Sequence, residues 1–198
     1  MHHHSRHLAS FVALARILIL AIFVAACSVI NEEQCLQGDW HYIGYADGER
    51  GFYPNARLTE ISEGCSAYGI SPDNQVYRDG HQLGLRRYCT AANGYLLGED
   101  GKAISDLCPS DLRPAFLQNY LAGLTLRMQN QSAKLNEYAT TFTFFEAEYN
   151  RLLRSNIAED ELDEARDRVR YARWMMEYYK FVLNNTQSKI DAWSLQLN

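Results

Sequence analysis

The sequence predicts a mainly α-helical fold, with an α+β arrangement as the alternative. A small disulfide-linked unit rich in glycine turns is expected to precede a long antiparallel α-helical hairpin. Two observations predict this fold: four cysteines and nearly all glycines lie between residues 35 and 110, and two long apolar heptad series follow. The expected segments are a lipoprotein signal peptide (1–26), a lipidated linker (27–34), the Cys/Gly-rich turn unit (35–110) and the hairpin (111–198).

The N-terminus carries the features of an export signal. Ile17–Ala26 is an unbroken apolar run. A bilayer span needs about 20 residues, so we expect the hydrophobic region of a signal peptide and not a transmembrane helix. The run ends in Val24-Ala25-Ala26-Cys27, the pattern of a bacterial lipoprotein processing site, so Cys27 is the predicted lipidation site, with palmitate as an acyl chain. Ser28 follows, and the resemblance to Gram-negative lipoproteins then implies anchoring in the outer membrane, facing the periplasm.

The charge of the chain argues against nucleic acid as a partner. The formal net charge is −5, and it becomes −7 once Arg6 and Arg16 leave with the signal peptide. An acidic chain without a dense basic patch lacks the electrostatic surface that nucleic-acid binding needs. We therefore expect contact with a membrane through the N-terminal lipid, and no nucleic acid.

The four cysteines after Cys27 are expected to form two disulfides. An exported chain folds in an oxidising compartment, where such cysteines pair. No Cys-x-x-Cys spacing occurs that would favour a metal site. Three connectivities are open, and we favour Cys35–Cys65 with Cys89–Cys108 because each bond then joins neighbouring segments.

A Tyr-x-x-Gly pattern follows each of these cysteines, which indicates a loose four-fold repeat. The four copies begin at Tyr45, Tyr77, Tyr95 and Tyr120. Four pairs of Asn or Asp with Gly accompany them: Asp47-Gly48, Asp79-Gly80, Asn93-Gly94 and Asp100-Gly101. Such pairs favour tight turns, because both residue types tolerate positive φ. Short strands or extended arms are expected between the turns.

The same glycines and cysteines carry a resemblance to a known family. The residues concerned are Asp39-Trp40, Gly44–Gly48, Cys65, Tyr77–Leu85, Tyr88-Cys89, Gly98, Gly101 and Cys108-Pro109. Together they resemble family 2799 of the domains of unknown function, over about residues 35–125. The resemblance implies a periplasmic lipoprotein of a Gram-negative bacterium and implies no activity.

After residue 110 the pattern becomes that of two long helices. The first apolar series is Leu117, Leu121, Leu124, Met128, Gln131, Leu135, Tyr138, Phe142, Phe145, Tyr149 and Leu152. The second is Leu162, Ala165, Val169, Ala172, Met176, Tyr179, Leu183, Thr186, Ile190, Trp193 and Leu197. Both have the spacing of a coiled-coil seam. They face each other in an antiparallel hairpin, for example with Leu152 opposite Leu162 and Phe142 opposite Ala172.

The second predicted helix carries another apolar stripe on the side away from this seam. It consists of Tyr171, Trp174, Tyr178 and Phe181, separated by three, four and three residues. Four large rings in water would be unusual. We expect them to be covered by the Cys-rich unit, or to bind a protein partner or a second copy of the chain.

The sequence contains no motif that favours an enzyme class, and we expect no catalytic residue, cofactor or metal. The candidate for acid–base chemistry is a turn with Asp79 and His81, although a solvated turn histidine is the simpler expectation. We predict a structural or adaptor role in the cell envelope. The alternative is an envelope enzyme or a small-ligand-binding lipoprotein that uses the Asp/His/Tyr-rich turns, which a pocket joining His81, Asp79 and Arg86 or Arg87 would favour.

Overall fold

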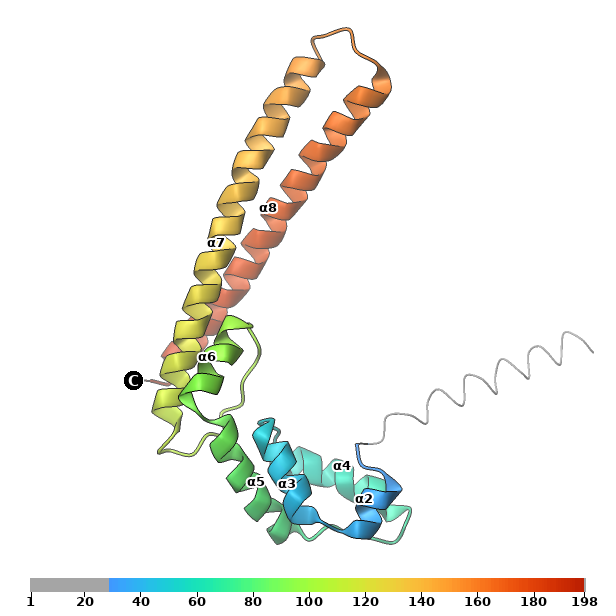
Figure 1. Cartoon of the computed structure of the whole chain (residues 1–198), viewed down its shortest axis with the longest axis vertical. Helices are drawn as coiled ribbons and strands as arrows, with labels where there is room; N and C mark the ends of the chain where they lie inside the picture. The colour runs from blue at the N-terminus through green and yellow to red at the C-terminus, as the bar shows by residue number, and fades with distance from the viewer. Residues whose placement is uncertain (1–28, 198) are drawn as a thin grey trace, which may run out of the picture. The chain divides into compact units, whose positions relative to one another are not determined.

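The computed structural model describes residues 29–197, and in this range it is helical without strands (Figure 1). Its helices are α2 (Glu32–Gln37), α3 (Trp40–Glu49), α4 (Pro54–Ser66), α5 (Asn74–Tyr88), α6 (Ala91–Glu99), α7 (Arg113–Leu152) and α8 (Glu159–Ser194). The predicted signal peptide and Cys27 lie outside the described residues. Between residues 29 and 197, no helix is both long enough and apolar enough to span a bilayer.

The chain divides into two compact units, and the division falls within α5. Among the described residues, the first unit contains residues 29–48 together with Phe52–Leu83, and the second contains Glu49–Gly51 and residues 84–197. The second disulfide and α6 therefore belong to the same unit as the long helices.

The first unit is built around a disulfide and a small apolar core. Cys35 in α2 bonds to Cys65 in α4, and both are buried. Core side chains pack around this bond from α3, α4 and α5 and from the chain before α2: Ile30, Trp40, Leu58, Ile61 and Tyr77. Asn31 caps α2, because its side chain accepts from the backbone N–H of Gln34, whose own side chain bonds back to the backbone of Asn31.

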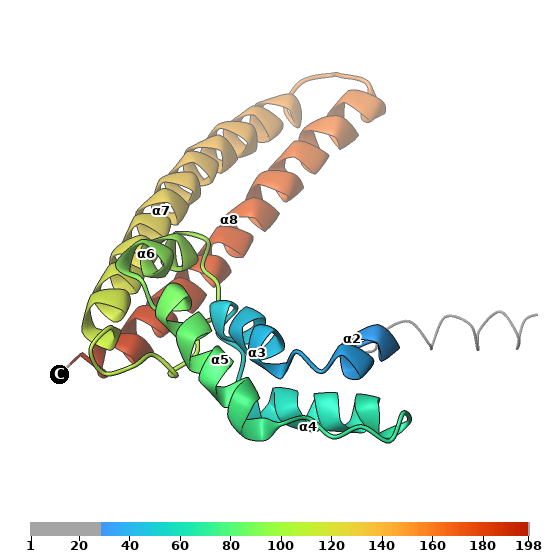
Figure 2. The same ribbon diagram turned by 60° about the horizontal axis from the view of Figure 1, so that its bottom comes forward.

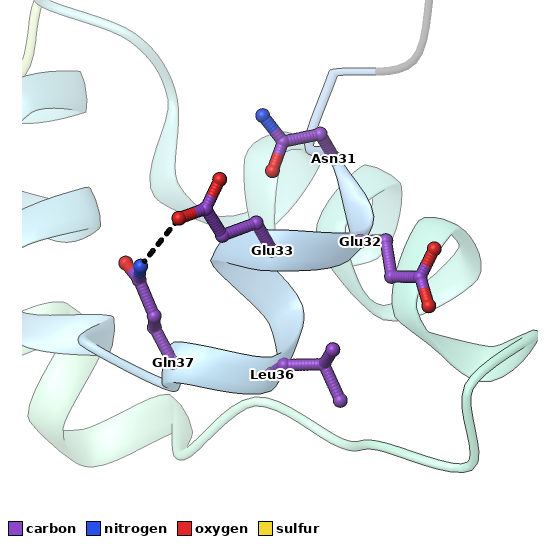
Figure 3. Close-up of a pocket in the computed structure, with 5 residues that line it drawn as sticks. All are labelled: Asn31, Glu32, Glu33, Leu36 and Gln37. Atoms are coloured by element: carbon purple, nitrogen blue, oxygen red, sulfur yellow. Dashed lines mark hydrogen bonds between the residues drawn. The ribbon is translucent and has the colours of Figure 1, made fainter.

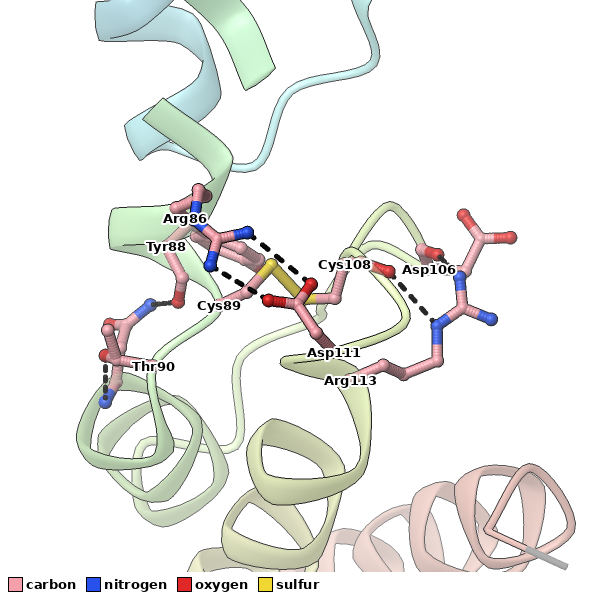
Figure 4. Close-up of a disulfide and its surroundings, with 9 residues drawn as sticks. Arg86, Tyr88, Cys89, Thr90, Asp106, Cys108, Asp111 and Arg113 are labelled. Atoms are coloured by element: carbon pink, nitrogen blue, oxygen red, sulfur yellow. Dashed lines mark hydrogen bonds and ion pairs between the residues drawn. A yellow bond between two sulfur atoms is a disulfide. The ribbon is translucent and has the colours of Figure 1, made fainter. Parts of the chain in front are cut away.

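The second unit begins around the other disulfide, Cys89–Cys108 (Figure 4). Buried side chains surround it: Leu85, Tyr88, Phe116 and Leu117. On the surface beside it, Arg86 of α5 and Asp111 pair at 2.9 Å. Arg113 donates to the carbonyl oxygens of Cys108 and Asp106. Both disulfides have the pairing favoured from the sequence.

The structure contains a two-fold repeat where the sequence suggested a four-fold one. The pattern Cys-x8-Gly, followed later by Cys-x11-Tyr-x2-Gly, occurs once in each unit. The first copy is Cys35, Gly44, Cys65, Tyr77 and Gly80, and the second is Cys89, Gly98, Cys108, Tyr120 and Gly123. In each copy the disulfide joins the two cysteines, and two helices cross at the two glycines.

The glycine crossings are equivalent in the two units. A methyl group added at Gly44 of α3 would collide with the carbonyl oxygen of Tyr77 in α5, and one at Gly98 of α6 with that of Tyr120 in α7. Added at Gly80 or Gly123, a methyl group would collide with the backbone of the other helix of the pair. Glycine is needed at these positions because the two backbones touch.

The expected strands and most of the expected turns are wrong. The pairs Asp47-Gly48, Asp79-Gly80 and Asn93-Gly94 lie inside α3, α5 and α6. Of the four pairs, only Asp100-Gly101 is at a turn, where Gly101 has a φ of 67°. Within α3, α5 and α6 the glycines recur at four-residue spacing and provide flat helix faces for close packing, which outweighs their low helix propensity.

The predicted helical hairpin is present. α7 has 40 residues and α8 has 36, and they run antiparallel side by side (Figures 1 and 2). Small side chains of α8 are buried along the seam, among them Ala165, Val169 and Ala172. A buried hydrogen bond of 2.8 Å from the Thr186 hydroxyl to the Gln131 side chain crosses the seam.

Candidate functional site

The four stripe residues are the most conspicuous exposed apolar group on α8. The exposed fractions of Tyr171, Trp174, Tyr178 and Phe181 are 56%, 62%, 47% and 68%. The seam residue Ala172, one position from Tyr171, is fully buried. The stripe therefore faces away from the seam, as the spacing predicted, and the rest of the second unit leaves it open to solvent.

Three of the stripe rings belong to a closed circuit of aromatic contacts. Trp174 lies 6.4 Å from Tyr171 and stacks on Tyr178 at 6.0 Å between ring centroids. Tyr178 contacts Tyr179 at 5.3 Å, and Tyr179 stacks on Tyr138 of α7 at 5.5 Å. Tyr138 then contacts Tyr171 at 6.5 Å, which closes the circuit. Packing between neighbours orders these exposed rings.

Sequence reasoning placed Tyr138 and Tyr179 in the seam and missed their second role. Both are half-buried and support the exposed rings from below. Burial and a hydrogen bond to Tyr171 raise the pKa of the Tyr138 hydroxyl. The adjacent tyrosines 178 and 179 were the available signal, because neighbours on a helix point about 100° apart and can join two faces.

A polar hollow of about 300 Å³ lies beside the aromatic circuit. It is lined by Glu99, Arg127, Asn130, Gln131, Lys134, Tyr178, Tyr179 and Val182. The cations in it have partners: Lys134 pairs with Glu137 at 2.7 Å, and Arg127 donates to the carbonyl oxygen of Glu99 at 3.3 Å. The hollow therefore places the charged side chains of Arg127 and Lys134 next to the aromatic circuit.

A second polar arrangement is buried in the first unit. Asp47 of α3 is 2% exposed and receives two hydrogen bonds from the Arg57 guanidinium, at 3.0 and 3.2 Å. The Tyr77 hydroxyl donates to the same carboxylate at 2.9 Å. Burial and the charge of Asp47 raise the pKa of Tyr77 well above its ordinary value. The carboxylate is thus fully engaged within the protein, as a buried charge must be.

The sequence candidate pair Asp79 and His81 is not formed. The Asp79 carboxylate is exposed and accepts from Gln75 at 2.9 Å. His81, expected in a solvated turn, is 2% exposed, and its Nε2–H donates to the carbonyl oxygen of Phe52 at 2.7 Å. Burial lowers the pKa of His81. Arg86 pairs with Asp111, so these candidates have separate partners.

Two further hollows are shallow surface features. One of about 500 Å³ is lined by α2 and its cap alone: Asn31, Glu32, Glu33, Leu36 and Gln37. Figure 3 shows these side chains pointing in different directions, with Gln37 bonded to Glu33. Another, of about 410 Å³, lies between α4 and α5, where Arg78 donates to Asn55 at 2.6 Å. Within residues 29–197, no group of three or more His, Cys, Asp or Glu side chains is placed to hold a metal ion.

Comparison with known proteins identifies a family and no activity. No curated protein and no solved structure matches the chain. The sequence profile of the family described as "Protein of unknown function (DUF2799)" matches residues 39–125. This range contains both crossed glycine pairs and three of the four disulfide cysteines, and it ends early in α7. The predicted resemblance to this family is therefore confirmed over residues 39–125, which make up less than half of the chain.

Proposed function

We propose that the chain is a membrane-anchored periplasmic lipoprotein with a structural or adaptor role in the cell envelope, which binds a protein partner through the exposed stripe of α8. The observation that carries the proposal is the exposure of four large rings on one face of a long helix. Contiguous exposed apolar groups of this kind are typical of interaction sites.

The chemistry of the stripe fits a protein partner. Trp and Tyr are the residue types that most often dominate binding energy in protein interfaces. The stacking of Trp174 on Tyr178 holds both rings in place before binding, so association costs less side-chain entropy than it would for mobile side chains. Ten residues separate Tyr171 from Phe181, which corresponds to about 15 Å along the helix. That length suits one helix or strand of a partner.

The lipid anchor is supported by the sequence. Val24-Ala25-Ala26-Cys27 follows an apolar run too short to span a bilayer. Ser28 at the next position supports the outer membrane as the destination. A triacylated cysteine exceeds the two signals that stable anchoring needs. The acyl chains would keep the protein at the membrane while the hairpin meets its partner.

The alternative function, an envelope enzyme or small-ligand-binding lipoprotein, has less support. It relied on Asp, His and Tyr side chains in open turns. Asp47, Tyr77 and His81 are instead buried and bonded to other parts of the first unit. We therefore keep the adaptor role as the proposal.

The test uses the full-length chain in the bacterium that produces it. Crosslinked complexes are recovered through a C-terminal tag from wild type, from Trp174→Ala, and from Phe144→Ala as the control, since Phe144 is a similarly exposed ring of α7. We expect Trp174→Ala to weaken association by about 2 kcal/mol, roughly 30-fold, and to melt as wild type does. Phe144→Ala should have little effect.

Equal recovery of partners from wild type and Trp174→Ala would contradict the adaptor role. The anchor is tested on the same membranes. Cys27→Ala should remain an unprocessed, unacylated precursor, and an identical mature mass in both versions would contradict lipidation.

A further inference from the structure

The spacing of the stripe is the same when read from either end. Its residues are separated by three, four and three positions, so the pattern is symmetric about position 176. If a second α8 is laid antiparallel on this face, Tyr171 meets Phe181 of the second copy, and Trp174 meets Tyr178 of the second copy. The reverse contacts then form as well. An interface with a two-fold axis requires this self-complementarity, because each residue must suit its counterpart in both directions.

We propose that the partner at the stripe is a second copy of this chain, with the two α8 helices packed antiparallel about a two-fold axis at the level of residue 176. This inference rests on the proposed function, because it names the occupant of the same surface. All four rings are then covered by four other rings, and offset or edge-on ring contacts are favourable beyond their area.

The charges that extend the stripe favour the antiparallel direction. Asp163 and Asp167 continue the same face of α8 before Tyr171, and Lys189 continues it after Phe181. In the symmetric register, Asp163 of one copy lies opposite Lys189 of the other. A parallel arrangement would place the acidic residues of both copies together, and like charges repel. Lys189 donates one hydrogen bond, to the Gly101 carbonyl oxygen at 2.6 Å, and keeps two N–H donors for a carboxylate.

Charges beside the rings are also complementary. Arg173 lies on one edge of the stripe toward its N-terminal end and Glu177 on the same edge toward its C-terminal end. Antiparallel packing brings Arg173 of one copy near Glu177 of the other, twice per dimer. In the single chain Glu177 pairs with Lys180 at 2.8 Å and Arg173 lies over the Phe142 ring at 5.2 Å. The contact between the two copies would therefore be shared with partners that both charged groups already have in the single chain.

The experiment tests the register directly. Two full-length versions with different C-terminal tags are made, one with Tyr171→Cys and the other with Phe181→Cys, and membranes that contain both are treated with a short bis-maleimide crosslinker. We expect a mixed-tag adduct of two chains. Two differently tagged Tyr171→Cys chains should not crosslink, and neither should two Phe181→Cys chains, because ten residues separate those pairs by about 15 Å along the helix. Phe144→Cys is the matched exposed control, and chains without an added cysteine measure the background.

A second measurement does not depend on the added cysteines. The mass of the full-length protein in detergent, measured by sedimentation, should be that of two chains for wild type and one chain for Trp174→Ala. Crosslinks between identical positions would overturn the antiparallel register. If neither a two-chain adduct nor a two-chain mass is seen while Trp174→Ala still loses another protein, the second-copy assignment fails and the adaptor role stands. If Trp174→Ala changes neither the mass of the protein nor the recovery of partners, both the second-copy assignment and the adaptor role fail.

Discussion

The two repeats have the same frame and different interiors. In each repeat, the two cysteines form a disulfide and two helices cross at glycines. In each, a tyrosine hydroxyl of the second crossing helix donates to a residue near the C-terminal end of the other crossing helix, which is α3 in the first repeat and α6 in the second. In the first repeat, Tyr77 donates to the buried carboxylate of Asp47 at 2.9 Å. In the second, Tyr120 donates to the backbone carbonyl oxygen of Lys102 at 2.8 Å. The equivalent tyrosine hydroxyls thus donate to a charged carboxylate in the first repeat and to a neutral carbonyl oxygen in the second.

The residue after the second glycine differs in the same way. It is His81 in the first repeat and Leu124 in the second, and both are buried. The frame of one disulfide and two helices crossed at glycines therefore accepts either a polar or an apolar side chain in its interior. Disulfide and glycine crossing determine how the helices meet, and the remaining side chains determine how stability responds to mutation and to pH.

The largest expected effect comes from removing the charge that is unique to the first repeat. Asp47→Ala removes the acceptor of the Tyr77 hydroxyl and the buried partner of the Arg57 guanidinium, whose side chain is 17% exposed and which keeps a contact with exposed Glu60 at 2.8 Å. Breaking such a pair from one side should lower the free energy of unfolding by about 3 kcal/mol. Asp79→Ala, at an exposed carboxylate, is the control and should change it by no more than about 0.5 kcal/mol. Similar denaturant midpoints for both variants would show that the buried pair is not important for stability.

A paired substitution measures the difference between the two tyrosines. Tyr77→Phe removes a hydrogen bond to a charged group and should cost about 1.5–3 kcal/mol, whereas Tyr120→Phe removes one to a neutral carbonyl and should cost about 0.5–1.5 kcal/mol. Burial raises the pKa of Tyr120 to about 12, and the charge of Asp47 adds to the effect of burial at Tyr77. Equal losses in chemical denaturation would remove the distinction between the repeats.

The smallest effect is a pH dependence confined to the first repeat. Burial lowers the pKa of His81 below its ordinary value of about 6.5, so the unfolded chain binds more protons than the folded chain below that pH. The stabilising contribution of neutral His81 is complete above pH 6.5 and is lost as the pH falls toward the folded pKa. His81→Leu, which copies Leu124, should reduce the loss of stability between pH 7.5 and 5.5. His41→Leu, at an exposed site, is the control. If His81→Leu loses as much stability as wild type between pH 7.5 and 5.5, His81 is not the source of the pH dependence.

The hairpin was predictable because its signal is long. Two uninterrupted heptad series define both helices and their register, and the burial of Ala165 and Ala172 follows from small residues facing large ones. The exposed stripe followed from the same seam, since residues opposite a satisfied face have no partner within the hairpin. The contribution of Tyr138 and Tyr179 could not be predicted, because it depends on how two faces of α8 and one of α7 meet in space.

The first repeat was harder to predict because glycine has two opposite uses. Next to Asp it favours a turn, and at every fourth position of a helix it allows two backbones to touch. Taken alone, Asp47-Gly48 and Asp79-Gly80 suggested turns. The role in helix packing is visible only when Gly44 and Gly80 are known to face the opposite helix. The buried cluster was missed for the same reason, since Asp47 was assigned to a turn and not to a helix that faces Arg57 and Tyr77.

The order of the disulfides along the chain has a consequence for biogenesis. Each bond joins a cysteine to the next one in the sequence: Cys35 to Cys65, then Cys89 to Cys108. A chain that enters an oxidising compartment N-terminus first, and is oxidised as its cysteines arrive, would form the native bonds directly. The first repeat could close before the second has emerged. Such a protein would depend on a dithiol oxidase and hardly at all on a disulfide isomerase.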